Sequence, residues 1–82
     1  MSSLEDITET IRASLKLMVD DPEHVEVECL QIAGGTCLCI EVSSTDLGKI
    51  IGKQGRNARA LRVLASAMGM TLKQRITLDI QK

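Results

Sequence analysis

The sequence contains no aromatic side chain: Phe, Trp and Tyr are all absent from its 82 residues. Folds that bind single-stranded nucleic acid by stacking bases on aromatic rings, such as the RRM and the OB-fold, therefore lose their main device here. Any contact between this chain and a base has to come from an aliphatic or a polar side chain.

Long apolar runs and dense cysteines are missing as well. The longest uncharged run, from Cys29 to Ile40, is about half of the roughly 20 residues that a membrane span needs, and no signal-peptide pattern opens the chain. Three cysteines are too few, and odd in number, for a disulfide scaffold. We therefore expect a cytoplasmic protein with reduced thiols, in which residues 1–82 form a single domain.

The net charge of −1 conceals a strong separation of charge along the chain. Residues 1–46 carry two basic and ten acidic residues, giving −8, whereas residues 47–82 carry eight basic residues and one acidic residue, giving +7. This separation favours a cationic face for a phosphate-bearing partner. The alternative is that the two halves pair with each other inside the molecule.

The N-terminal segment predicts an amphipathic helix. Ser2 and Glu5 have the spacing of a capping box, and residues 20–22, Asp-Asp-Pro, end the pattern. Between them, apolar residues recur at helical intervals: Leu4, Ile7, Ile11, Leu15 and Met18.

A β-hairpin is predicted next. From Val25 onward apolar residues alternate with glutamates, until Leu30 and Ile32 change the parity and predict a bulge. The pair Gly34-Gly35 is typical of a two-residue turn. We expect the return strand at residues 36–43, with Leu38, Ile40 and Val42 toward the helices and Cys37, Cys39 and Glu41 on the other face.

The C-terminal half predicts two helices and a strand. A short helix capped by Ser44 runs through Ile50, a longer one runs from Gly55 to a C-cap at Gly69, and a strand spans residues 71–81. The longer helix places Ala58, Leu61, Leu64, Ala65 and Met68 inward and clusters Arg56, Arg59 and Arg62 on its other side.

The resulting order αββααβ indicates an α+β fold with a three-stranded sheet and three helices packed on one face. The second and third strands are joined through helices, so a right-handed crossover makes them parallel if they are neighbours. The sheet is then mixed.

The loop between the two C-terminal helices carries the clearest functional signal. Gly52 and Gly55 enclose two polar residues and, lacking Cβ atoms, let the backbone approach a ligand closely. The free N–H groups of the next helix start beside them. With Lys53 at the tip and Arg56 in the first helical turn, this segment predicts an anion site.

Other kinds of site are excluded by spacing. Gly48 and Gly52 are separated by three residues where a P-loop needs four, and Ile50 stands where a dinucleotide fingerprint needs glycine. No nucleophile with its base, no carboxylate pair and no metal-ligand set can be assembled around His24 or the cysteines, so we expect neither an enzyme nor a bound cofactor or metal. The methionines Met18, Met68 and Met70 are expected in or near the core.

Gly52-Lys53-Gln54-Gly55, preceded by two aliphatic residues and followed by a basic helix, resembles the GXXG signature of the KH domain. The extra helix and strand before the core are similar to the type II arrangement. The resemblance covers Leu4 to Ile80, and the segments 20–28 and 46–62 are similar to those of the KhpA family of small bacterial single-KH proteins.

The resemblance implies binding of single-stranded RNA, with about four nucleotides held between the loop and an aliphatic groove. Gly52, Lys53, Gln54 and Gly55 would hold the phosphate backbone, Ile50 and Ile51 would border the bases, and Lys49, Arg56 and Arg59 would add positive potential. It also implies an RNA chaperone or post-transcriptional regulator that acts as a homodimer or with a KhpB-like RNA-binding partner in cell-wall and cell-shape control. The alternative is a degenerate KH fold that serves as a protein-protein interaction adaptor.

Overall fold

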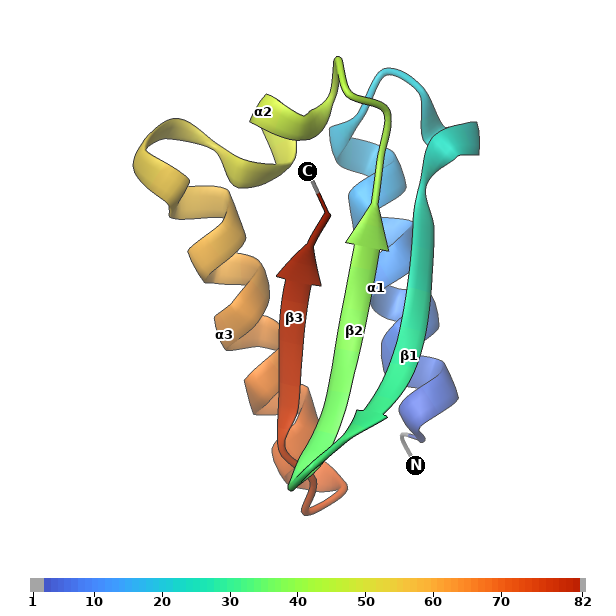
Figure 1. The fold of residues 1–82 in the computed structure, drawn as a ribbon, viewed down its shortest axis with the longest axis vertical. Coiled ribbons are helices and arrows are strands. Elements are labelled where there is room, and N and C mark those ends of the chain that lie inside the picture. The colour runs from blue at the N-terminus through green and yellow to red at the C-terminus, as the bar shows by residue number, and fades with distance from the viewer. Residues whose placement is uncertain (1–2, 82) are drawn as a thin grey trace.

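In the computed structural model, which describes residues 3–81, the elements follow the predicted order αββααβ (Figure 1). Short 3-10 turns, η1 (Pro22–His24) and η2 (Lys53–Gly55), precede β1 and α3. The helices are α1 (Leu4–Met18), α2 (Leu47–Ile51) and α3 (Arg56–Thr71), and the strands are β1 (Glu26–Ile32), β2 (Gly35–Glu41) and β3 (Ile76–Ile80).

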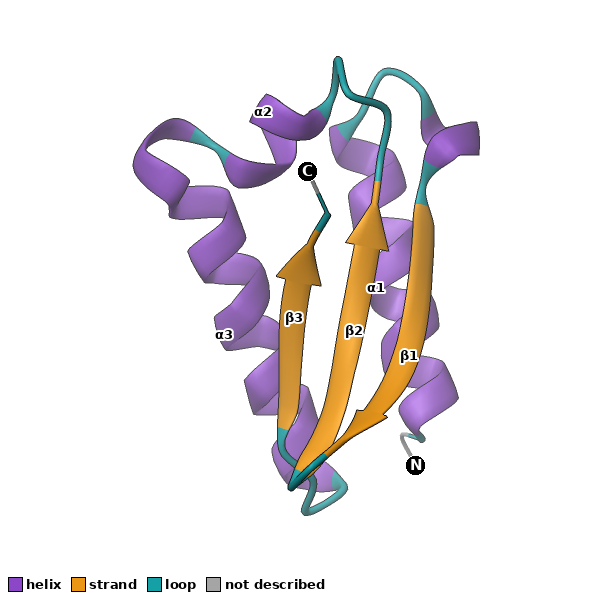
Figure 2. Ribbon diagram, in the orientation of Figure 1, coloured by secondary structure: helices purple, strands orange, loops and turns teal. Residues whose placement is uncertain are grey.

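The three strands form one mixed sheet in the order β1-β2-β3. β1 and β2 are antiparallel, whereas β2 and β3, which are joined through α2 and α3, are parallel. Figure 2 looks onto the open face of the sheet, with α1 and α3 behind it. The expected α+β fold with a mixed sheet and helices on one face is therefore confirmed.

The core lies between the sheet and the helices. Leu38 and Ile40 of the central strand are fully buried, as are Ile11 and Leu15 of α1 and Ile50 of α2. β2 and β3 alternate between this layer and the open face, as the sequence pattern predicts for β2, whereas in β1 only Val27 is buried. The core residues are Ile7, Ile11, Leu15, Val25, Val27, Leu38, Ile40, Ile50, Ala58, Leu61, Ala65, Ile76, Leu78 and Ile80.

The N-terminal cap lies one residue later than predicted. The Ser3 hydroxyl accepts the backbone N–H of Asp6, and the Asp6 carboxylate accepts the N–H of Ser3, both at 3.2 Å. Ser2 lies outside the described residues. Because α1 begins at Leu4, its N-cap is Ser3, and the residue three positions later is Asp6. Asp6 therefore completes the capping box in place of Glu5.

The predicted bulge is wrong, and the hairpin turn is shifted. Pairing between β1 and β2 runs without interruption to Ile32, which lies opposite Gly35. Gly35 is therefore a strand residue, and the turn consists of Ala33 and Gly34, whose φ is +82°. Because the strand stays regular, the change of parity places Leu30 and Ile32 on the open face of the sheet, 45% and 44% exposed.

The C-terminal half also corrects several boundaries. The residue before α2 is Asp46 rather than Ser44, and β3 begins at residue 76 rather than 71. α3 continues through Gly69, so this glycine is a buried residue of the helix and not its C-cap. A Cβ at this position would lie 2.8 Å from the carbonyl oxygen of Gln74, so the close approach of that backbone requires glycine. Leu64, expected to face inward, is 42% exposed, and Met70, expected in or near the core, is 74% exposed.

Candidate nucleic-acid interface

The loop between α2 and α3 is a tight reversal built on left-handed backbone conformations. Gly52, Gln54 and Gly55 have φ values of +77°, +56° and +74°. The N–H of Gly52 donates to Gly48 O at 2.8 Å, and the N–H of Gly55 donates to Gly52 O at 3.1 Å. These turns end α2 and start α3 within the four residues 52–55, so the loop projects at the N-terminus of α3.

Asn57, which the sequence analysis missed, contacts the loop and links it to α2. Its Nδ2 donates to the carbonyl oxygen of Lys49 at 2.8 Å and so ties the first turn of α3 to α2. A Cβ on Gly52 would lie 2.7 Å from Asn57 Cγ, so the first glycine is required by contact as well as by φ. The available signal was an amide side chain two residues after the GXXG segment.

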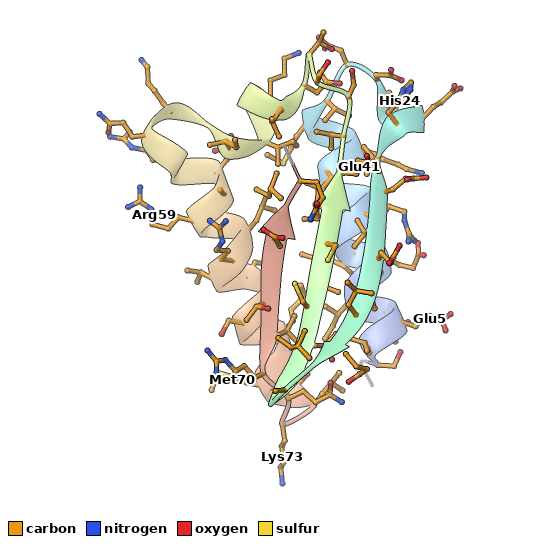
Figure 3. All side chains as sticks on the ribbon, viewed as in Figure 1. Glu5, His24, Glu41, Arg59, Met70 and Lys73 are labelled. Carbon is orange, nitrogen blue, oxygen red and sulfur yellow. The ribbon has the colours of Figure 1, made fainter. Side chains whose placement is uncertain are left out.

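Two guanidinium groups fold back onto the loop. Arg59 Nη2 donates to the carbonyl oxygen of Gln54 at 2.9 Å, and Arg56 Nη2 lies 3.4 Å from Gln54 Oε1. Lys53 and Gln54 are exposed at the tip. Each guanidinium has five N–H donors, so both keep donors for an anion while their loop contacts position them. The structure therefore gathers the predicted loop, Arg56 and Arg59 in one place, and Figure 3 shows Arg59 on the outer side of α3.

Lys49 is engaged within the protein. Its ammonium pairs with the carboxylate of Asp20 and lies 3.6 Å from Asp46 Oδ1. Asp46 is 1% exposed and accepts the backbone N–H groups of Asp20 and Asp21, each at 3.1 Å. The hydrogen bond from the Asp20 N–H, followed by that from Asp21 and by the Lys49 charge, lowers the pKa of Asp46 despite its burial. The ion pair with Asp20 raises the pKa of Lys49. The network fixes the segment after α1 to α2.

The two aliphatic residues before the loop differ in environment. Ile50 is fully buried in the core, whereas Ile51 is half-buried. Ile50 therefore supports the loop from the core, and of the pair only Ile51 has a surface that a ligand can touch.

The family resemblance implied a groove beside the loop without placing it, and the structure has a groove between α3 and the edge strand β3. Its volume is about 430 Å³. Arg62 Nε donates to the carbonyl oxygen of Leu78 at 3.3 Å across it. Arg62 follows Arg59 by about one helical turn, so cations run from the loop into the groove. The lining residues are Arg62, Ser66, Arg75, Ile76, Thr77 and Leu78.

The cysteines and acidic residues build no metal centre. Within residues 3–81, no three His, Cys, Asp or Glu side chains come together as metal ligands. Cys37 Sγ and Cys39 Sγ lie 3.9 Å apart on the open face of the sheet. Burial, and then the neighbouring Cys37 thiol, raise the pKa of Cys39, which works against a reactive thiolate. None of the helices in this range has the length and hydropathy to span a bilayer.

Comparison with known proteins decides the family. Residues 8–80 match the family described as KhpA/KhpB, KH domain. The chain is also 43% identical to RNA-binding protein KhpA of Aquifex aeolicus, with 98% of each chain covered. The chain belongs to the KhpA family. Membership of the KhpA family agrees with the expectation from the sequence that the chain is not an enzyme.

Further similarities agree with this membership. RNA-binding protein KhpA of Caldanaerobacter subterraneus is 40% identical to the chain, over 88% of this chain and 96% of the relative. A crystal structure of Era from Aquifex aeolicus superimposes with a TM-score of 0.62 over 90% of this chain and 29% of the Era chain, at 17% identity. At that identity the likeness concerns the fold alone, and it agrees with the type II KH arrangement.

Proposed function

We propose that this KhpA family member binds single-stranded RNA in the cytoplasm as one KH unit spanning residues 1–82. The observation that carries the proposal is the GXXG loop, where Gly52 and Gly55 turn the backbone at the N-terminus of α3 while Arg59 is anchored on Gln54 O. An anion bound at this loop would meet backbone N–H groups, the positive end of the α3 dipole and two guanidinium groups.

The proposed contacts follow from this geometry. Gly52, Lys53, Gln54 and Gly55 hold the phosphate backbone, with Arg56 and Arg59 supplying charge-assisted hydrogen bonds. Ile51 borders the bases, and Ile50 supports it from the core. Lys49 adds positive potential, reduced by its pairing with Asp20 and Asp46.

The groove between α3 and β3 extends the site toward the bases. Its lining combines the cations Arg62 and Arg75 with the polar Ser66 and Thr77, whereas Ile76 and Leu78 are core residues that are only 3% and 5% exposed. Bases of an unpaired strand can turn into such a groove, whereas the bases of an A-form duplex face one another. The protein is therefore expected to prefer an unpaired strand over a hairpin stem of the same sequence.

Action as a homodimer or with a KhpB-like RNA-binding partner completes the proposal. One short groove and a few cationic contacts bind weakly, and linking two sites raises the effective concentration without adding contacts. In this form we place the protein among RNA chaperones or post-transcriptional regulators in cell-wall and cell-shape control.

The test compares two charge reversals that are matched in size. Lys53→Asp changes the loop tip, and Lys73→Asp makes the same change at the opposite end of the molecule, as Figure 3 shows for Lys73. Lys73 has φ +55°, a conformation that aspartate tolerates. Titration of a labelled unpaired RNA by fluorescence anisotropy should show weaker binding for Lys53→Asp only. Equal weakening would place the RNA elsewhere, and absence of RNA binding by the wild-type chain would favour the adaptor function.

A further inference from the structure

The open face of the sheet, opposite the helices, has its own chemistry. The strand register places Glu26 beside Glu41, Glu28 beside Cys39, and Cys39 beside Asp79. Further along the same face, Leu30 pairs with Cys37, and Ile32 follows at the edge. The face is thus acidic at one end and apolar at the other.

The negative charge at the acidic end is not neutralised by ion pairs among the described residues. The three strands contain no lysine or arginine. None of the four carboxylates, on Glu26, Glu28, Glu41 and Asp79, forms an ion pair within residues 3–81. Glu26 and Glu41 lie directly opposite each other, an arrangement that destabilises a sheet. A hollow of about 380 Å³ lies here, lined by Glu26, Glu28, Leu30, Cys39, Glu41 and Gln81.

The apolar end is exposed to water. Leu30 and Ile32 are 45% and 44% exposed, although both stand in regular strand positions beside Cys37 and Gly35. Neither side chain contributes to the core cluster. Burial of these two side chains under a partner would be favourable by the same hydrophobic effect that packs the other face.

We propose that this face docks a cationic amphipathic segment of a partner protein, with its lysines or arginines over Glu28 and Glu41 and its aliphatic residues on Leu30 and Ile32. RNA is disfavoured because its phosphates would meet four carboxylates. A second copy that applied the same face about a two-fold axis along the strands would oppose carboxylates to carboxylates, and about an axis across the strands it would place carboxylates on Leu30 and Ile32, so both arrangements are unfavourable. In Figure 3, Glu41 lies on the sheet and Arg59 on the outer side of α3, so the partner and the RNA would occupy different surfaces.

The experiment uses a helical peptide of leucine and arginine, and a control peptide with glutamate in place of arginine. The wild-type chain should bind the arginine peptide only. Glu28→Lys/Glu41→Lys should weaken this binding by at least about tenfold. The matched reversal of two exposed glutamates elsewhere, Glu5→Lys/Glu23→Lys, should change it by less than about twofold.

A milder variant keeps the test valid if charge reversal impairs folding. Glu28→Gln/Glu41→Gln removes the repulsion between Glu26 and Glu41, so it should melt at or above the wild-type temperature while still binding the peptide less well. Unchanged peptide affinity in both variants would overturn the proposal, as would equal binding of the glutamate peptide.

Two further readouts separate this proposal from RNA binding. Affinity for unpaired RNA should not fall in either sheet-face variant. Loss of both RNA and peptide binding would indicate a shared site, and it would overturn the docking proposal but not the proposal of RNA binding. Sedimentation that shows dissociation of an oligomer in Glu28→Lys/Glu41→Lys, without peptide binding by the wild type, would assign the face to a second copy and likewise overturn it.

Discussion

Gly52 lies so close to Asn57 that a Cβ on the glycine would stand 2.7 Å from the asparagine Cγ and 2.9 Å from its backbone nitrogen. The second loop glycine, Gly55, has no atom within 4 Å of the corresponding position, although both glycines have positive φ. The two glycines of the GXXG segment therefore serve different purposes, one for contact and conformation, the other for conformation alone.

Substitution of the two glycines should separate these purposes. Gly55→Ala is expected to lose about 1–2 kcal/mol of unfolding free energy from its left-handed backbone, and Gly55→Asn less, because asparagine tolerates that region. Gly52→Ala should lose more than Gly55→Ala, since α3 must shift as well. Urea unfolding measures the order, and equal losses for the two alanine variants would contradict the close contact with Asn57.

Replacing both loop-tip residues should abolish RNA binding without unfolding the domain. Lys53→Asp/Gln54→Asp changes exposed side chains, for which stability usually changes by no more than about 0.5 kcal/mol. Two carboxylates would face the phosphates, a repulsion that a weak complex cannot tolerate. Circular dichroism and thermal melting should match the wild type while the RNA titration stays flat. RNA binding at wild-type affinity would remove the loop from the site.

Binding should depend on salt to a limited degree. If Lys53, Arg56 and Arg59 neutralise about three phosphates of a single strand, the slope of log K against log salt should be about −2, from about −0.7 per phosphate. RNA titrations at several potassium chloride concentrations give this slope. A value near zero would contradict phosphate recognition by these cations.

Asp46 should make the stability of the fold depend on acid. The pKa of Asp46 in the folded protein lies below its ordinary value of 3.8. The stability that the ionised Asp46 contributes is therefore complete above pH 3.8, and it is lost as the pH falls from 3.8 through the folded pKa. Asp46→Asn should lower the melting temperature at neutral pH and lose less stability on acidification than the wild type does. Thermal melts across this range provide the measurement, and parallel pH profiles would exclude Asp46 as the titrating group.

The sequence by itself determined the features that rest on local chemistry. Helical periodicity from Leu4 to Met18, strand alternation around Leu38 and Ile40, and the spacing of Gly52 and Gly55 each depend on near neighbours in the chain. They were sufficient for the order αββααβ, for the mixed sheet and for locating the loop at which we propose an anion site. Boundaries near Ser2, Gly35 and Gly69 were placed less well, because helix ends and strand register are decided by contacts that local pattern does not contain.

Tertiary structure alone decided which site residues are available to a ligand. Lys49 meets Asp20 across 29 positions of the chain, and Asp46 meets the Asp20 amide across 26, so no local spacing could show that this lysine is already paired. The separation of Ile50 from Ile51, the groove between α3 and β3, and the open acidic and apolar face of the sheet likewise arise only when distant elements pack. The physical reason is that burial and charge pairing depend on which distant surfaces the fold brings into contact, and a local sequence pattern does not contain that information.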